Sequence, residues 1–579
     1  MHRRRLLSAG FAATLGLTLS ACGNSGTSAT AKVASTVVVA EAPQSSPNWF
    51  FPVIGSSASS NTNIQTDALM YKPLLFITSQ GSVDYRRSLA SSIQVNGSGT
   101  VYTIHLNPKW HWSNGHSVTA KDVVFTFNLF KFAAGTSSSL PWSYAFSGIG
   151  GLPQDWQSAV ALNSHTVQVT VSQPVNPDWF ILNGLGQISP VPASVWDKYP
   201  QSMTDNMKRI LHVANSPGAP EYQVVDGPYR FVSMKPNTDW IFQANPHYDG
   251  HKATIQKLIF QYETSTQSEF LGLKNGTIDV GYLPSNLWNS QSQLTHDVLS
   301  TPYILGYNYL QPNLSSKAPG HIGAAFSHAY VRQALEMGIN QQGIINTFFH
   351  GHGVVEDSPV PAKPPTKFYD PALAKPPFGY NPKAGLALLE HHGWTLQNGV
   401  LTKNGIRLAF NMIYMSGDPT LTHMVELIKS TWAQEGIQVS LQAEPFANVI
   451  GTASQSDPSK WQMAFWGGGW TYEPDFYPSG DGLLNSGGGA NDGGYANHHM
   501  DQLINATTNL TGTSAQIRQR MDAYLQYAAQ QVPVIWLPWT SSSYVGTGFP
   551  EHATTVHGTV KTFNLVTDLY YPNRWTISP

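Results

Sequence analysis

The chain has 579 residues, of which 11% are charged, and a formal net charge of −2 at pH 7. Since about 25% charged residues are usual in a globular protein, uncharged polar side chains and histidine must supply most of the polar surface. The small acidic excess argues against nucleic acid or an anionic lipid surface as a partner. A chain of this length exceeds what one hydrophobic core usually serves, which predicts two or more lobes.

The first 35 residues have the composition of an export signal followed by a tether. Arg3, Arg4 and Arg5 precede an apolar run over 6–19, which is too short and too early for a structural transmembrane helix. The consecutive arginines leave general secretory and twin-arginine export both open. Residues 23–35 are rich in Gly, Ser, Thr and Ala, which predicts a flexible tether. Without the three arginines of the signal, the mature chain has a net charge near −5.

Cys22 is the only cysteine in the sequence, so it cannot form an internal disulfide. The surrounding Ser-Ala-Cys-Gly of residues 20–23 resembles a bacterial lipobox. This resemblance implies a lipoprotein signal peptide over 1–21, cleavage before Cys22 and diacylglycerol on the Cys22 sulfur. The alternative is a plain signal peptide with a chance cysteine. No apolar run after residue 22 is long enough to span a bilayer, so we expect an extracytoplasmic domain tethered by its lipid.

The beginning of the mature chain contains three segments with regular patterns. Residues 35–40 are β-branched and apolar, which predicts a buried strand. Residues 61–75 carry apolar side chains at helical spacing and predict a helix that ends near Pro73. Residues 101–106 alternate between apolar and polar side chains and predict a second strand.

The segment 109–123, Lys-Trp-His-Trp-Ser-Asn-Gly-His-Ser-Val-Thr-Ala-Lys-Asp-Val, follows this second strand. Its Asn114-Gly115 pair predicts a tight turn between two short extended pieces. Thr119 is a good helix N-cap, with Asp122 three residues later, and predicts a helix that continues through Phe130.

A strand followed by W-x-W-S-N-G-x-x-V-T-A-x-D-V resembles the signature of the family 5 solute-binding proteins. These are extracytoplasmic receptors of ABC importers for oligopeptides, dipeptides, nickel and some oligosaccharides. Further segments resemble family patterns in the same order, so that the resemblance covers about residues 36–570. They are 225–231, 245–248, 271–280, 331–340, 380–394 and 434–439. The first of them departs from the family's G-T-G-P-Y-x-F pattern, because Asp226 replaces the usual lead-in to Gly227-Pro228.

Most of these motif residues have structural interpretations. Gly227 and Pro228 predict a turn, and Gly276 and Gly393 predict helix ends. We expect Arg332 to cap or pair within its own lobe rather than contact ligand. For Trp110 and Trp112 of the signature, packing in the core and at the turn is the expected role. A platform for the ligand is the alternative.

The candidate ligand site lies where an alternating run over 462–466 meets three glycines and an aromatic segment over 470–477. Glycines let a backbone approach another surface closely, and aromatic side chains offer flat walls at low entropic cost. A glycine-rich surface loop with buried aromatics is the alternative. The candidate ligand-binding residues are Trp466, Gly467, Gly468, Gly469, Trp470, Thr471, Tyr472, Glu473 and Asp475.

The family resemblance implies a role for one of these carboxylates. In the family's peptide receptors this segment lines the cleft, and an aspartate pairs with the peptide α-ammonium. Alignment on Trp470 places Glu473 at that position. In a second register Pro474-Asp475 matches a later D-P step and the ammonium anchor is missing. A sugar or another uncharged ligand is then favoured, with Trp466, Trp470 and Tyr472 able to stack on a pyranose ring. Both registers stay open, as does the choice of Glu473 or Asp475 as the residue that faces the ligand.

Two loops are expected at the edge of the cleft. Residues 487–497 resemble the family's N-x-x-G-Y-x-N loop, and residues 48–51 follow the first strand at a ligand-facing position of the family. For the first of these loops, a flexible rim is the alternative.

Metal binding and catalysis have little support in the sequence. The twenty histidines include the pairs 391–392 and 498–499, but adjacent residues of a helix face different ways. We therefore predict no metal site and no cofactor. Nucleophile-elbow, zinc-protease, P-loop and dinucleotide motifs are absent, so we predict that the protein is no enzyme. The alternative from another class is a lipid-anchored glycoside hydrolase with Glu473 and Asp475 as its acid pair.

The resemblance implies an α/β two-lobe fold of the periplasmic-binding-protein type, type II, in the large cluster C form with an extra subdomain in lobe I. Lobe I is predicted over 36–302 with the subdomain at about 76–200, and lobe II over 303–540. Residues 541–579 return to lobe I, so the chain crosses a hinge near 302 and 540. We expect a monomer that captures a peptide between the lobes and delivers it to ABC permease subunits, on the outer face of the membrane or in the periplasm. An oligosaccharide is the second ligand class and a nickel complex the third.

Overall fold

The computed structural model describes residues 36–78, 81–135, 137, 139–281, 283, 285–295, 297, 303–472, 476–508, 513–540, 552–553, 560–561 and 572–577. The predicted signal peptide, the tether and Cys22 lie outside these ranges, as do Glu473 and Asp475 of the candidate site. Within the ranges, no helix has the length and apolar character that a membrane crossing requires.

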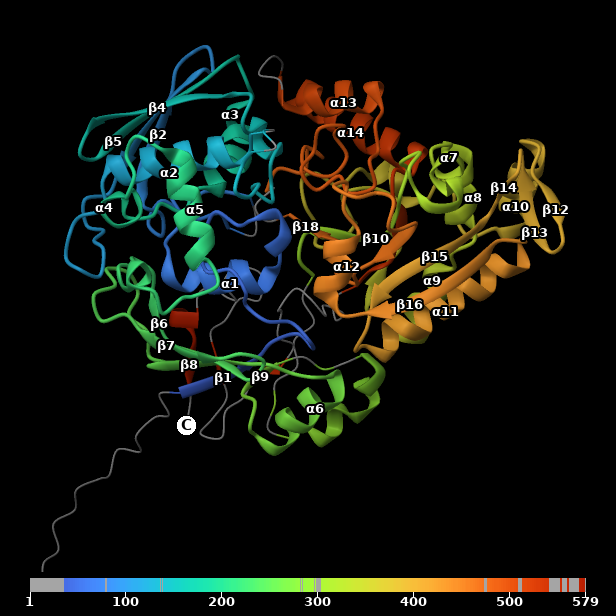
Figure 1. The fold of residues 1–579 in the computed structure, drawn as a ribbon, viewed down its shortest axis with the longest axis horizontal. Helices are drawn as coiled ribbons and strands as arrows, with labels where there is room; N and C mark the ends of the chain where they lie inside the picture. Colours follow the sequence, from blue (N-terminus) through green and yellow to red (C-terminus); the bar gives the residue numbers. More distant parts are fainter. Residues whose placement is uncertain are drawn as a thin grey trace, which may run out of the picture.

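One mixed sheet of six strands has the order β21-β9-β1-β8-β7-β6 and lies at the lower left of Figure 1. We call the half of the molecule that contains it lobe I. Strand β1 pairs in parallel with β8 and β9, whereas the other neighbours are antiparallel. The strands are β1 (Thr36–Ala40), β6 (Tyr229–Lys235), β7 (Asp239–Ala244), β8 (Lys257–Gln261), β9 (Val280–Gly281) and β21 (His552–Ala553).

A second six-stranded sheet has the order β16-β15-β17-β10-β18, with β19 paired to β10. It lies at the right of Figure 1, and we call this half lobe II. Its strands are β10 (Gly306–Pro312), β15 (Ala409–Met415), β16 (Gln438–Glu444), β17 (Met463–Phe465), β18 (Trp470–Thr471) and β19 (Ile535–Leu537). Smaller pairings add β11 (Gly353–Val354) with β20 (Trp539–Thr540), β12 (Thr395–Gln397) with β13 (Val400–Lys403) and β14 (Ile406–Arg407), and β22 (Val560–Lys561) with β23 (Thr576–Ile577).

Lobe I carries an additional four-stranded antiparallel sheet, in the order β2-β3-β5-β4, at the upper left of Figure 1. Helix α2 packs on β4 and β5 and also contacts α4 and α5. We call this unit the subdomain. Its elements are β2 (Ala90–Val95), β3 (Val101–Leu106), β4 (Trp156–Asn163), β5 (Thr166–Val171), α2 (Ala120–Ala133), α3 (Pro177–Trp179), α4 (Ala193–Trp196) and α5 (Met203–Val213).

The remaining α-helices flank these sheets. In lobe I they are α1 (Asn61–Met70) and α6 (Thr266–Asn275). In lobe II they are α7 (Ile322–Phe326), α8 (Ala329–Met337), α9 (Gln341–Phe348), α10 (Pro382–His391), α11 (Pro419–Gln434), α12 (Phe446–Thr452), α13 (His498–Thr508) and α14 (Ser514–Gln531). The predicted α/β class and the two-lobe fold are confirmed.

Local sequence signals are confirmed where they depend on neighbouring residues. The two predicted strands form as β1 and β3, and helix α1 ends at Met70, three residues before Pro73. Thr119 and Asp122 form the capping box of α2. Gly276 ends α6 with a φ of +75°, a left-handed conformation that glycine adopts without steric cost.

The aromatic signature and Arg332 stabilise the fold. Trp110 and Trp112 are buried, and their indole N–H groups donate to the Ser88 carbonyl and to Asp122. The guanidinium of Arg332 donates to the carbonyls of Phe326, Gln531 and Val532, the last two at the C-terminal end of α14. As predicted, Arg332 caps an element of its own lobe.

The departure at Asp226 has a structural explanation. Its Oδ1 accepts from the backbone N–H of Lys72 at 3.0 Å. The Lys72 ammonium lies over the Trp110 ring, 4.2 Å from the centroid. Asp226 therefore fixes the chain that leaves α1. Burial dominates both side chains of this pair: it lowers the pKa of Lys72 to about 7 and raises that of Asp226 to about 8, although each group acts on the other in the opposite direction.

Candidate functional site

A cavity of about 630 Å³ lies between the lobes and is lined by residues of both. Lobe I contributes one face of α1, the chain that follows this helix and parts of the subdomain; lobe II contributes three separate segments. The lining residues of lobe I include Ile54, Ile64, Asp67, Ala68, Tyr71, Leu75, Phe76, Tyr144, Phe146, Gly186 and Gln187. Those of lobe II include Tyr303, Ile304, Leu305, Lys367, Phe368, Thr471, Tyr472 and Phe476. A concave, mainly apolar site with a few polar groups is typical of small-ligand binding.

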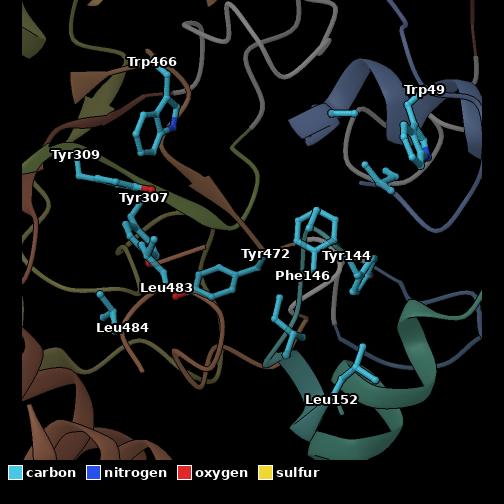
Figure 2. Close-up of a cluster of buried hydrophobic side chains, with 14 of the residues drawn as sticks. Trp49, Tyr144, Phe146, Leu152, Tyr307, Tyr309, Trp466, Tyr472, Leu483 and Leu484 are labelled. Carbon is cyan, nitrogen blue, oxygen red and sulfur yellow. The ribbon is translucent and has the colours of Figure 1, made fainter. Parts of the chain in front are cut away.

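Figure 2 shows Tyr472 between Tyr307 of lobe II and Phe146 and Tyr144 of the subdomain, with its ring on the side of Tyr307, 5.9 Å away between centroids. Its hydroxyl donates to the Pro359 carbonyl at 2.6 Å. The Tyr144 hydroxyl donates to Gln187 at 2.9 Å, and the Gln187 amide donates to the Ile149 carbonyl at 3.1 Å. These polar groups therefore already have partners within the protein.

Asp67 is the acidic residue among the described residues that line the cavity. The residue is 6% exposed, both carboxylate oxygens are buried from solvent, and neither has a hydrogen-bond partner in the described part of the chain. Burial raises the pKa of Asp67 well above its usual range. No sequence pattern predicts this residue as part of the site. The only available signal was a carboxylate on the helix face that also carries Ile64 and Ala68.

Two residues of the predicted site, Thr471 and Tyr472, line the cavity. The five predicted residues that precede them are not among the described lining residues. They form the turn between β17 and β18 and the first position of β18. Trp466 is 8% exposed, packs edge-on against Tyr309 and donates its indole N–H to the Gly469 carbonyl at 3.1 Å (Figure 2). A direct role of Trp466, Gly467, Gly468, Gly469 and Trp470 in ligand binding stays a prediction.

The glycine turn has a clear packing role. Gly467 and Gly469 adopt φ values of +85° and +60°. A Cβ atom on Gly469 would lie 2.0 Å from the Tyr307 carbonyl oxygen of β10. Only glycine therefore lets β18 return against β10 and bring Tyr472 to the cavity.

The two candidate carboxylates, Glu473 and Asp475, lie outside the described residues. In sequence they fall between Tyr472 and Phe476, and both of these flanking residues line the cavity. The assignment of either acid to a ligand ammonium stays a prediction.

The two predicted edge loops lie in different environments. In the loop of residues 48–51, Trp49, Phe50 and Phe51 are buried in the core. In the loop of residues 487–497, the Gly489 N–H donates to the Ser147 carbonyl of the subdomain at 2.7 Å. This second loop therefore contacts lobe I beside the cavity rather than forming a described part of its lining.

A second contact between the lobes lies next to the cavity. The Asp481 carboxylate accepts from the indole N–H of Trp179 at 2.7 Å. The side-chain amide of Asn183 donates to the Tyr477 carbonyl, and its oxygen accepts from the Tyr477 N–H. Burial raises the pKa of Asp481 to about 6, although hydrogen bonds from the Ser479 hydroxyl, the Trp179 indole and the Gly150 N–H act in the opposite direction.

The described part of the chain contains no candidate metal site. No group of three or more His, Cys, Asp or Glu side chains with the arrangement of a metal site occurs in the described ranges. His391 and His392 lie at the end of α10, where the His392 ring stacks on Tyr330.

Comparison with known proteins assigns the family. Residues 84–491 match the model of the bacterial extracellular solute-binding proteins, family 5 Middle. The oligopeptide-binding protein AppA of Bacillus subtilis is 21% identical over 433 residues, 74% of this chain and 73% of AppA. The nickel-binding periplasmic protein of Escherichia coli is 29% identical over 269 residues, 44% of this chain and 47% of that protein.

Solved structures show the same fold. The chain resembles B. subtilis AppA in complex with a nonapeptide with a TM-score of 0.78 and 18% identity, over 94% of this chain and 99% of that one. It resembles NikZ of Campylobacter jejuni in complex with Ni(L-His) with a TM-score of 0.70 and 19% identity, over the same shares. The chain belongs to the family 5 bacterial extracellular solute-binding proteins.

Proposed function

We propose that this protein is an extracytoplasmic receptor that captures a peptide between its two lobes and delivers it to the permease of an ABC importer. The observation that carries the proposal is the cavity between the lobes, lined by residues of both, in a chain of this family. Relatives named as oligopeptide- and dipeptide-binding proteins support the peptide class. Binding without catalysis agrees with a family defined by solute binding.

A ligand in this cavity stabilises the closed arrangement, because only there does it contact both lobes. We place lobe I at 36–302 with the return at 541–579, and lobe II at 303–540. Two contacts support the return: β21 pairs with β9, and the Thr254 hydroxyl donates to the Trp575 carbonyl at 2.9 Å. The crossings near 302 and 540 form the hinge.

Glu473 is the proposed partner of the peptide α-ammonium. The support is its position in sequence between two cavity residues, Tyr472 and Phe476. Replacement of Glu473 by glutamine should weaken peptide binding by about 2 kcal/mol or more, as for a desolvated charged hydrogen bond. Unchanged affinity for a defined peptide would remove this role.

Membrane attachment through Cys22 is a separate proposal, supported by the lipobox-like sequence of residues 20–23. The Cys22→Ser variant should leave the membrane fraction and appear in the soluble extracytoplasmic fraction. Continued membrane association of the variant would refute lipidation.

Native mass spectrometry tests the ligand class. The chain from residue 23 onward is purified without refolding, so that ligand acquired from the host is retained. Heterogeneous added masses that match short peptides are the expected result. A ladder spaced by hexose or pentose units would replace the peptide proposal by sugar uptake. If no ligand is retained, thermal-shift measurements with peptides and with oligosaccharides identify the ligand class. We expect peptides to raise the melting temperature.

A further inference from the structure

The cavity between the lobes has few charged residues in its wall. Among the described lining residues, Asp67 and Lys367 carry a charge. Both carboxylate oxygens of Asp67 are buried from solvent, so a ligand in the cavity cannot reach them. Lys367 is exposed, with its ammonium 5.1 Å from the centroid of the Phe368 ring, so water continues to solvate it. The described wall therefore presents no desolvated charge to a ligand.

Most uncharged polar groups of the wall have partners within the protein or are simple hydroxyls. The Tyr144 hydroxyl donates to Gln187, and the Gln187 amide donates to the Ile149 carbonyl. The Tyr472 hydroxyl donates to the Pro359 carbonyl. A hydroxyl both donates and accepts, which suits the uncharged peptide bonds of a ligand. Apart from two further tyrosines, the remaining polar lining residues are the hydroxyl residues Thr78, Ser189, Thr366 and Thr471.

Apolar side chains form the largest part of the wall and come from both lobes. Ile64 and Ala68 are four positions apart, on one side of α1, and both are only partly buried. Phe476 of lobe II is also partly buried. The protein thus leaves part of this apolar surface uncovered. A ligand that covers it gains the free energy of removing apolar surface from water.

The two lobes approach one another at Gly186 of the subdomain. A Cβ atom at this position would lie 2.7 Å from Cδ1 of Ile77 and 3.6 Å from Cδ2 of Phe476. Ile77 belongs to lobe I and Phe476 to lobe II, and all three residues line the cavity. The small residue therefore lets apolar side chains of both lobes lie side by side. An apolar ligand group that contacts both is buried only in the closed arrangement, so its binding favours closure.

We propose that this cavity takes an apolar side chain of the ligand, and that the receptor selects short peptides with an aromatic or large aliphatic residue. The inference rests on the proposed function and deepens it by naming the side-chain class. The cavity volume of about 630 Å³ lies within the range of about 300–1,000 Å³ for small-ligand sites, which suits a peptide of a few residues. A charged side chain is disfavoured, because the described wall has no desolvated countercharge to replace its hydration.

Isothermal titration with matched ligand pairs tests this inference. The first pair is Ala-Leu-Ala and Ala-Asn-Ala, whose central side chains have similar shape and opposite polarity. The second is phenyl β-glucoside and methyl β-glucoside, which carry the same sugar with and without an aromatic ring. The wild-type protein should bind the more apolar member of a pair at least 10-fold more tightly, because burial of a leucine-sized side chain is worth at least that factor.

Two variants of the wall test whether this cavity is the source of the preference. Ile64→Asn places an amide on the partly buried apolar wall and should reduce the preference for leucine at least 3-fold. Ala68→Leu fills part of the cavity and keeps a good helix former. It should weaken the binding of Ala-Phe-Ala at least 10-fold and that of Ala-Ala-Ala less than about 2-fold.

Ile93→Asn is the matched control. Ile93 is a partly buried isoleucine of β2 in the same lobe, and it is not among the described lining residues. This variant should keep the wild-type preference. Melting temperatures establish that each variant is folded, and Ala68→Leu decides alone if Ile64→Asn does not fold.

The outcomes distinguish the inference from the proposed function. If peptides bind without a preference for leucine, or if the wall variants change the preference no more than Ile93→Asn does, the apolar selectivity is overturned and the peptide receptor stands. If only the glucosides bind, with a preference for the phenyl form that the wall variants reduce, the peptide proposal fails and the apolar site stands. If no ligand of either pair binds, both are overturned.

Discussion

Trp179 of the subdomain donates its indole N–H to the Asp481 carboxylate of lobe II at 2.7 Å, across 302 positions of sequence. The Gly150 N–H donates to the same oxygen at 3.4 Å. Both side chains are buried, and Phe476 of the same lobe II loop lines the cavity. This contact therefore joins the two lobes beside the proposed ligand site.

The Asp481→Ala variant should lower the free energy of unfolding by about 1–3 kcal/mol, because a buried indole N–H loses its acceptor. Trp179→Phe should cost less, since the carboxylate keeps the Gly150 donor. Urea denaturation of both single variants and the double variant gives the coupling energy, which we expect to exceed about 0.5 kcal/mol. Strict additivity of the two effects would show that the hydrogen bond contributes nothing to stability.

Arg332 should be needed for folding and not for ligand binding. Its replacement by lysine loses the planar set of donors that serves three carbonyl groups, so the free energy of unfolding should fall by about 2–4 kcal/mol. Gln333→Ala on the same helix is the matched control, because its amide makes one exposed hydrogen bond, and should cost under about 0.5 kcal/mol. Calorimetry measures both. A loss of ligand affinity in a folded Arg332→Lys protein would contradict a purely structural role.

The elements that the sequence predicted well are those encoded by neighbouring residues. The capping box of α2 needs only Thr119 and Asp122, and β1 needs only its apolar run. Pairing between distant segments could not be predicted in this way. Asp226 departs from the family pattern, and its partner Lys72 lies 154 positions away.

The candidate site was predicted in part for the same reason. The aromatic segment was located, and Thr471 and Tyr472 line the cavity. The sequence could not show that Gly469 is required by its approach to Tyr307, because this contact depends on the order of strands in the sheet. Asp67 was missed because a single acid in a polar helix has no local pattern that separates a cavity wall from a solvent-exposed face.

Glu435 should make stability depend on pH. It is buried, both of its oxygens lack a hydrogen-bond partner among the described residues, and burial raises its pKa from 4.5 to about 8. The folded state then binds the proton more tightly than the unfolded state. The stabilisation is fully present below about pH 4.5 and is lost as the pH rises through 8.

Relative to the wild type, the Glu435→Gln variant should therefore gain about 1–3 kcal/mol in unfolding free energy between pH 5 and pH 8.5. Other buried acids affect both proteins equally, so the difference between the two denaturation profiles isolates Glu435. Glu390→Gln removes an exposed acid at the end of α10 and is the control. A constant difference across the pH range would show that Glu435 is solvated in solution.

Asp122 should be the most sensitive residue of the Trp-x-Trp segment. Its Oδ2 accepts from the Thr119 N–H, the Thr119 hydroxyl and the Trp112 indole N–H, and its Oδ1 accepts from the Ala193 N–H at 2.8 Å. One carboxylate thus caps α2, holds the signature turn and binds the first N–H of α4.

Asp122→Ala leaves several buried donors unsatisfied and should lower the unfolding free energy by about 3–4 kcal/mol. Lys121→Ala, at an exposed neighbour, should change it by less than about 0.5 kcal/mol. Because Thr119→Ala removes only the reciprocal cap, it should cost about 1 kcal/mol. Equal losses in the Asp122 and Thr119 variants would show that Asp122 acts as a helix cap alone, without holding α4 and Trp112 in place.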